Sequence, residues 1–166
     1  GPDGAAQPPA YTAEIDEDAL HLRLKAIFPE GLPNIYRMIL RNPRVLAGLV
    51  SMKEYLAGGE LTETERCLVA LEVANYCECG YCIVALSHYS VHDLGVSSTV
   101  IDAAAKGGLP GDARLDLVVG ATRALLATRG KLGRAELASY REKGLTFPEI
   151  LEIVGVIGEY TVATFS

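Results

Sequence analysis

The sequence has no tryptophan, no block of lysine or arginine, and no long apolar run. Its 15 basic and 21 acidic residues give a net charge of −6, and without a basic cluster neither a nucleic-acid surface nor a patch for anionic membranes is expected. No apolar stretch reaches the roughly 18 residues that a membrane-spanning helix needs, so no membrane partner is expected either. What remains is an acidic globular chain whose 166 residues suit one domain.

A recognisable export signal is also missing. The first four residues resemble a protease scar, and residues 1–12, rich in Gly, Ala and Pro, are expected to form a disordered leader. The 4 cysteines all fall between Cys67 and Cys82, whereas a secreted disulfide scaffold spreads its cysteines to join distant loops. We therefore expect a cytoplasmic protein with a local cysteine site, in a domain that covers residues 13–166.

Glycine and proline divide the chain into helix-length segments, and no convincing strand alternation is present. Two capping boxes, Thr62-x-x-Glu65 and Thr146-x-x-Glu149, mark helix starts. The sequence therefore predicts an all-α fold, with helices over residues 14–28, 33–41, 43–57, 62–76, 80–93, 98–106, 112–128, 134–142 and 147–164. The last segment is apolar nearly all round, which predicts burial on most faces and favours an oligomer.

The segment Cys79-Gly80-Tyr81-Cys82 lies at the start of a predicted helix. A thiol reacts as its thiolate, and the unpaired N–H groups of a helix start favour that anion. The spacing places the second sulfur one turn from the first, so the two can form a disulfide after one is oxidised. A redox dithiol is the favoured interpretation, and its alternative is a set of small core cysteines without chemistry.

A zinc site is the other chemistry that this region suggests. His88 and His92 are spaced i,i+4, and with Cys79 and Cys82 they would form a Cys2His2 set. However, His88 lies about 240° around the same helix from Cys82, so one straight helix cannot bring all four groups to one ion. We therefore predict no metal and no cofactor other than the redox-active disulfide.

Several stretches together match a known pattern: residues 32–37 (LPNIYR), 64–66 (TER), 69–75 (VALEVAN), 79–82 (CGYC), His88 with 95–97 (GVS), and 149–154 (EILEIV). From about Leu32 to Val162 the chain resembles the AhpD-like alkylhydroperoxidases of the carboxymuconolactone decarboxylase superfamily. The resemblance implies an all-helical fold assembled as a homotrimer or hexamer. It also implies a thiol peroxidase whose disulfide is reduced by a lipoyl or thioredoxin-like dithiol protein.

In the scheme that the resemblance implies, Cys82 attacks the peroxide and Cys79 resolves the sulfenic acid into a disulfide. Glu65 is then the base and His88 the proton relay. The family places a histidine four residues after the second cysteine, whereas this chain has Leu86 there. A break before the motif and a bulge in the helix after Cys82 could absorb the difference and realign His88; without them the proton relay is broken.

The remaining candidates have weaker signals. Glu72 is the reserve acid, because it lies in an apolar stretch where an unpaired carboxylate is costly to bury, although a partly exposed face would also explain it. Cys77 is either a third redox partner or a spectator. Tyr81 is expected to pack, with a hydrogen bond into the site as its functional alternative. His92 is expected to be structural, and Cys67 to belong to the core.

Two further functions stay open. A cofactor-free decarboxylase-like enzyme would not need the dithiol. A redox sensor or structural oligomer could keep the fold without turnover. In the non-catalytic interpretation Glu65 only caps its helix with Thr62, and His88 is a surface residue. Peroxide consumption by the protein in the presence of a dithiol would distinguish a peroxidase from these two alternatives.

Overall fold

The computed structural model describes residues 14–166, and all regular structure in that range is helical. The elements are α1 (Glu17–Ile27), α2 (Asn34–Ile39), α3 (Pro43–Ala57), α4 (Glu63–Tyr76), α5 (Gly80–His92), α6 (Ser98–Ala105), α7 (Ala113–Thr128), α8 (Arg134–Glu142) and α9 (Phe147–Phe165). The all-α prediction is confirmed, and each expected segment corresponds to one of these helices. The predicted leader over residues 1–12 lies outside the described residues.

The chain divides within α3 into two compact units, residues 1–47 and 48–166. In the described part of the first unit, α1 buries Leu20 and Leu24. The rings of Phe28 and Tyr36 stack there with centroids 4.6 Å apart. All the cysteines belong to the second unit.

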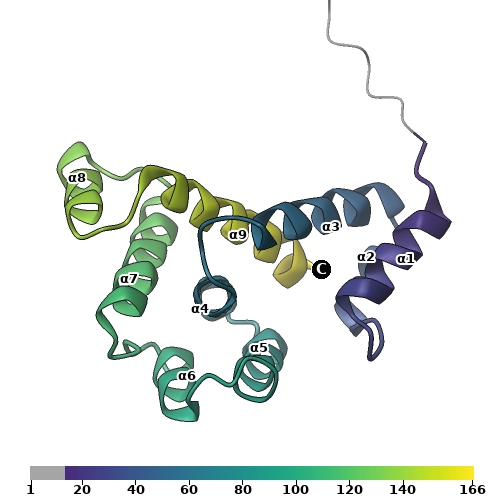
Figure 1. Cartoon of the computed structure of the whole chain (residues 1–166), viewed down its shortest axis with the longest axis horizontal. Helices are drawn as coiled ribbons and strands as arrows, with labels where there is room; N and C mark the ends of the chain where they lie inside the picture. The colour runs from purple at the N-terminus through teal and green to yellow at the C-terminus, as the bar shows by residue number, and fades with distance from the viewer. Residues whose placement is uncertain (1–13) are drawn as a thin grey trace, which may run out of the picture. The chain divides into compact units, whose positions relative to one another are not determined.

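Within the second unit, α4 is the central helix. It contacts α5, α6, α7 and α9, and Figure 1 shows it end-on with these helices around it. A helix surrounded in this way must be apolar on most faces, which explains the sequence CLVALEVA along α4. Two apolar clusters share its faces. One includes Val69, Val118, Ile153 and Val156, and the other includes Leu68, Leu71, Ile101 and Val119.

The two predicted capping boxes are both present. Thr62 accepts the N–H of Glu65 at 3.1 Å, and Thr146 accepts that of Glu149 at 3.2 Å. Both glutamates are buried, and Arg114 of α7 pairs with both of them. The starts of α4 and α9 are therefore joined through one guanidinium.

The outward face of α9 differs from the prediction. Its inner face buries Ile150, Ile153 and Val156, but an apolar stripe stays exposed, made up of Phe147, Leu151, Val154, Val162 and Phe165. Within one chain the helix is therefore buried on its inner face only, whereas the sequence predicted burial on most faces together with an oligomer. No helix among residues 14–166 is long and apolar enough to cross a membrane.

Candidate redox site

The two cysteines of the CxxC motif are joined in a disulfide at the start of α5. Their Cα atoms are 5.3 Å apart, within the usual range for disulfides. Cys79 is the N-cap residue, and its Sγ accepts the backbone N–H of Cys82 at 3.4 Å. The sequence-based expectation of a dithiol at a helix start therefore agrees with the observed geometry.

The end of α4 presents this motif through a tight turn. The N–H of Cys79 bonds to the carbonyl of Ala74 at 2.9 Å, and that of Glu78 to Asn75 at 3.1 Å. This is the Schellman pattern, in which the residue after the C-cap adopts a left-handed conformation and is usually glycine. Here Glu78 occupies that position with φ 53°. The predicted break before the motif is therefore present, and a strained residue forms it.

Replacing Glu78 by glycine is expected to stabilise the reduced protein by about 0.5–1 kcal/mol. The left-handed conformation costs a residue with a Cβ about 1–2 kcal/mol, and the extra freedom of glycine in the unfolded chain cancels part of the gain. Urea unfolding measures the change. Glu136→Gly, at an exposed site within α8, is the control and should instead destabilise by about 1 kcal/mol. Equal losses in both variants would contradict the strain argument.

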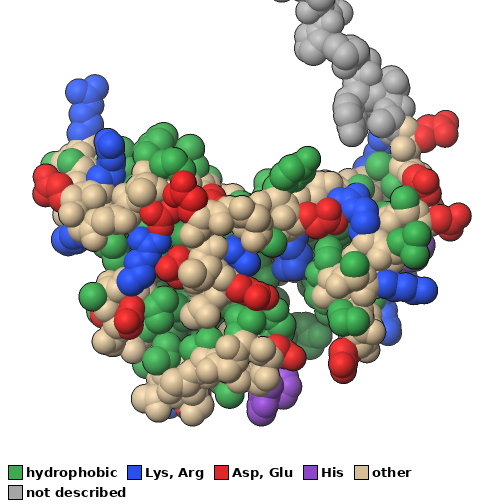
Figure 2. All heavy atoms as spheres, viewed as in Figure 1, with side chains coloured by type: hydrophobic (Ala, Val, Ile, Leu, Met, Phe, Trp, Pro, Cys, Tyr) green, Lys and Arg blue, Asp and Glu red, His purple; other side chains and the backbone are tan. Residues whose placement is uncertain are grey.

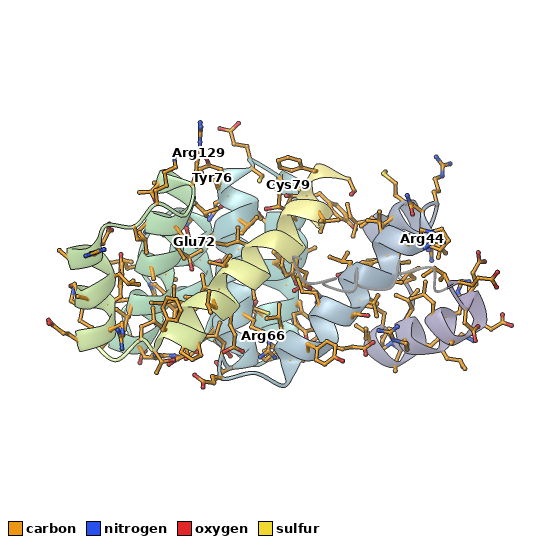
Figure 3. All side chains as sticks on the ribbon, turned by 90° about the horizontal axis from the view of Figure 1, so that it is seen from above. Arg44, Arg66, Glu72, Tyr76, Cys79 and Arg129 are labelled. Atoms are coloured by element: carbon orange, nitrogen blue, oxygen red, sulfur yellow. A yellow bond between two sulfur atoms is a disulfide. The ribbon has the colours of Figure 1, made fainter. Side chains whose placement is uncertain are left out.

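Glu65 does not lie at the dithiol. It is in the first turn of α4, and the 12 residues from there to Cys77 span about 18 Å of helix. Figure 3 shows its neighbour Arg66 and Cys79 at opposite ends of α4. Both carboxylate oxygens of Glu65 face Arg114, with Oε1 3.0 Å from the guanidinium Nε. The capping interpretation of Glu65 is confirmed, and its role as a base has no support in this arrangement.

The histidine is not realigned either. α5 is a regular α-helix from Gly80 to His92, so the bulge that could have realigned His88 is absent. Leu86, one turn after Cys82, packs against both apolar clusters. His88 is exposed and stacks on His92, with ring centroids 4.1 Å apart. Histidine side chains reach the surface over α5 in Figure 2.

The reserve acid, Glu72, is buried and paired. The guanidinium of Arg123 in α7 donates two hydrogen bonds to its carboxylate, at 2.8 and 2.9 Å. It also donates one to the carbonyl of Gly108. The bond to Glu72 raises the pKa of Arg123 above its usual value. Figure 3 places Glu72 on α4 between Arg66 and Cys79. The carboxylate is therefore held by a cation, and the alternative of a partly exposed Glu72 is wrong.

The remaining cysteines differ in their surroundings. Cys67 is buried, as predicted, and burial raises the pKa of its thiol to about 11, with a hydrogen bond to Ser90 partly opposing this shift. Such a thiol is unreactive at neutral pH. Cys77 is a free thiol of intermediate exposure at the end of α4. Tyr81 was expected to pack, but its side chain is 58% exposed.

Several polar partners were not predicted from the sequence. Arg114 and Arg123 pair with the buried acids of α4 from 49 and 51 residues away. The only local signal was two arginines in the largely apolar segment of α7. The hydroxyl of Tyr89 also donates to Glu63 at 2.5 Å, and burial together with this bond raises the pKa of Tyr89.

Comparison with known proteins gives a likeness in structure. No family model matches the sequence, and no curated protein matches it. The crystal structure of an uncharacterized peroxidase-related protein from Silicibacter sp. TM1040 superposes with a TM-score of 0.74 and 21% identity, covering 90% of this chain and 80% of that one. The two proteins share a fold, and this is consistent with the AhpD-like fold that the sequence resemblance implied.

Proposed function

We propose that this protein is a dithiol oxidoreductase that reduces hydroperoxides with Cys79 and Cys82. The observation that carries the proposal is the disulfide between these residues at the start of α5. A disulfide in a short surface-exposed turn, formed by two sulfurs one helical turn apart, is suited to reversible oxidation. The fold shared with a peroxidase-related protein favours a peroxide as the oxidant.

The reaction balances with the two thiols alone. The Cys82 thiolate attacks the outer oxygen of a hydroperoxide, the O–O bond breaks, and the alcohol leaves after taking a proton. The Cys82 sulfenic acid is then attacked by the Cys79 thiolate, and the hydroxyl leaves as water when the S–S bond forms. Two electrons pass from the dithiol to the peroxide. A dithiol protein, lipoyl or thioredoxin-like, returns them by exchange.

The turn supports the resolving role of Cys79. The Sγ of Cys79 accepts the N–H of Cys82, and this bond, at a helix start, favours the Cys79 thiolate. A stabilised thiolate leaves readily. A disulfide that includes Cys79 would therefore be reduced by attack on its partner sulfur, with departure of Cys79.

The proton steps are the slow part of this scheme. Glu65 is held by Arg114 far along α4, and His88 points from a different side of α5 than Cys82 does by helical rotation. The roles of Glu65 as base and His88 as relay, which the resemblance implies, therefore have no support in this arrangement. Solvent would carry the protons, which fits slow rather than rapid turnover.

One equivalent of hydrogen peroxide tests the proposal. The reduced protein is expected to form the Cys79–Cys82 disulfide, which peptide mass spectrometry locates and a dithiol reverses. Cys82→Ser should abolish both the disulfide and peroxide consumption, because it removes the attacking sulfur. Cys67→Ala, a buried site away from the turn, is the matched control and should keep both. Unchanged thiols in the wild type after prolonged exposure would refute a peroxide-reducing role.

A redox sensor is the second candidate. The observation that favours it is Leu86, an apolar side chain where a proton-transferring group would share the face of Cys82. A sensor would form the disulfide once and would not turn over with excess dithiol. Continuous peroxide consumption under those conditions would support the enzyme instead.

A homo-oligomer is part of the same proposal. The exposed apolar stripe of α9 and the exposed Tyr55 of α3 would gain burial against another copy. Sedimentation analysis would distinguish a trimer or hexamer from a monomer.

A further inference from the structure

We infer that Cys77 is an exchange thiol that replaces Cys82 as the disulfide partner of Cys79. The external reductant would then attack a Cys77–Cys79 bond. This inference rests on the proposed redox function of Cys79 and Cys82 and adds a third reacting sulfur. Three cysteines at positions 77, 79 and 82 surround one turn, and two are already joined. The third is free and only partly buried.

The backbone of the turn brings Cys77 close to Cys79. Only Glu78 separates them, and its φ of 53° gives it a left-handed helical conformation. The Cα atoms on either side of a left-handed helical residue are spaced as in the mirror image of an α-helix. Helix geometry places them about 5.4 Å apart. Disulfides form at Cα separations of about 4.4–6.8 Å. The Cα separation of Cys77 and Cys79 therefore lies within the range that a disulfide spans.

The exchange step is balanced without an oxidant. The Cys77 thiolate attacks the Sγ of Cys79, the Cys79–Cys82 bond breaks, and the Cys77–Cys79 bond forms. Cys82 leaves as a thiolate and takes up the proton that Cys77 released to solvent. The number of disulfides is unchanged, and Cys82 becomes a thiol again.

The external dithiol protein then reduces the Cys77–Cys79 bond. A thiolate of the partner dithiol attacks the Sγ of Cys77, and Cys79 leaves as a thiolate that accepts the N–H of Cys82. The partner's second thiol then attacks the mixed disulfide and frees Cys77. The neighbours Tyr76 and Glu78 are exposed, so this end of the turn is open to a protein partner.

Cys67 provides a contrast within the same chain. It is buried on the central helix, and burial raises the pKa of its thiol to about 11. Exchange depends on the thiolate fraction and on access to the sulfur. Cys67 therefore stays outside the exchange, whereas Cys77 takes part.

Proteolysis after glutamate separates the sulfurs cleanly. Glu65 precedes Cys67, and Glu72 and Glu78 lie between the cysteines. Cys67 therefore falls in the fragment 66–72, Cys77 in 73–78, and Cys79 with Cys82 in the fragment that begins at residue 79. The protein is oxidised with the thiol oxidant diamide, incubated at mildly alkaline pH, quenched in acid, and treated with N-ethylmaleimide before digestion. Using diamide keeps this test independent of any reaction with peroxide.

The expected result is a population of fragment 73–78 disulfide-linked to the fragment that begins at Cys79. Fragmentation spectra should assign the bond to Cys79, with the maleimide on Cys82. Cys67→Ala should give the same linkage. Cys77→Ser should leave only the Cys79–Cys82 bond and slow reduction of the oxidised protein by dihydrolipoamide.

Two results would overturn the inference: a fragment 73–78 that is fully maleimide-labelled after long incubation, or a linkage from Cys77 to Cys82. Failure of the proposed function looks different, because then diamide forms these bonds while peroxide forms none. The two hypotheses can therefore be rejected separately.

Discussion

Arg114→Met is expected to lower the free energy of unfolding by about 3 kcal/mol, because it leaves two buried carboxylates without their shared cation. Glu65 and Glu149 are 5% and 7% exposed, and each also closes a capping box. Arg114 is 35% exposed, which places the effect at the lower end for broken buried pairs. Methionine retains much of the aliphatic volume, so the loss reports on charge. Urea unfolding with an unchanged m-value measures it.

Two comparisons make this prediction specific. Arg134→Met removes an exposed arginine at the start of α8 and should change stability by no more than about 0.5 kcal/mol. Adding Glu65→Gln and Glu149→Gln to Arg114→Met should recover part of the loss, because neutral amides are cheaper to leave without a cation. A loss below about 1 kcal/mol in Arg114→Met alone would show that solvent screens the cluster.

The helices were predictable because their signals are local. Thr62 and Thr146 satisfy backbone donors three residues ahead, and such bonds form in any context that allows the helix. The break between α4 and α5 was also expected. Its cause was hidden, since Glu78 is a residue that rarely adopts the left-handed conformation this turn requires.

The surroundings of the dithiol were less predictable because they depend on distant partners. The sequence left Glu65 divided between a cap and a base. Its pairing with Arg114, 49 residues away, favours the capping role, and no local sequence pattern predicts such a contact. Glu72 was similarly settled by Arg123, which offsets the cost of its burial.

His88 illustrates a conflict between resemblance and helix geometry. The rotation of about 240° from Cys82 already indicated separate faces. A bulge would restore the pattern of the family, but α5 has no break between Gly80 and His92. Leu86 stands four residues after Cys82, where the family has a histidine. It packs against both apolar clusters, and this packing favours a regular helix.

Leu86→His is therefore expected to raise the rate constant for peroxide-driven oxidation of the dithiol by about 10²-fold, the lower range for a positioned general acid or base. Position 86 lies one turn after Cys82, and residues four apart on a helix are neighbours. An imidazole there could take the thiol proton and return it to the departing alcohol near neutral pH. Stopped-flow measurement under pseudo-first-order peroxide gives the constant.

The matched control is Val84→His, which adds the same group to α5 at a position 70% exposed and turned away from Cys82 by about 200°. It should leave the rate constant nearly unchanged. Because Leu86 packs in the core, the variant should also lose about 1–3 kcal/mol of stability, so a melting curve must show that it is folded during the assay. An equal rate increase in both variants would point to a nonspecific effect of added imidazole. A folded Leu86→His protein with no increase would mean that the proton transfer at Cys82 does not limit oxidation, and the missing histidine would then not explain slow turnover.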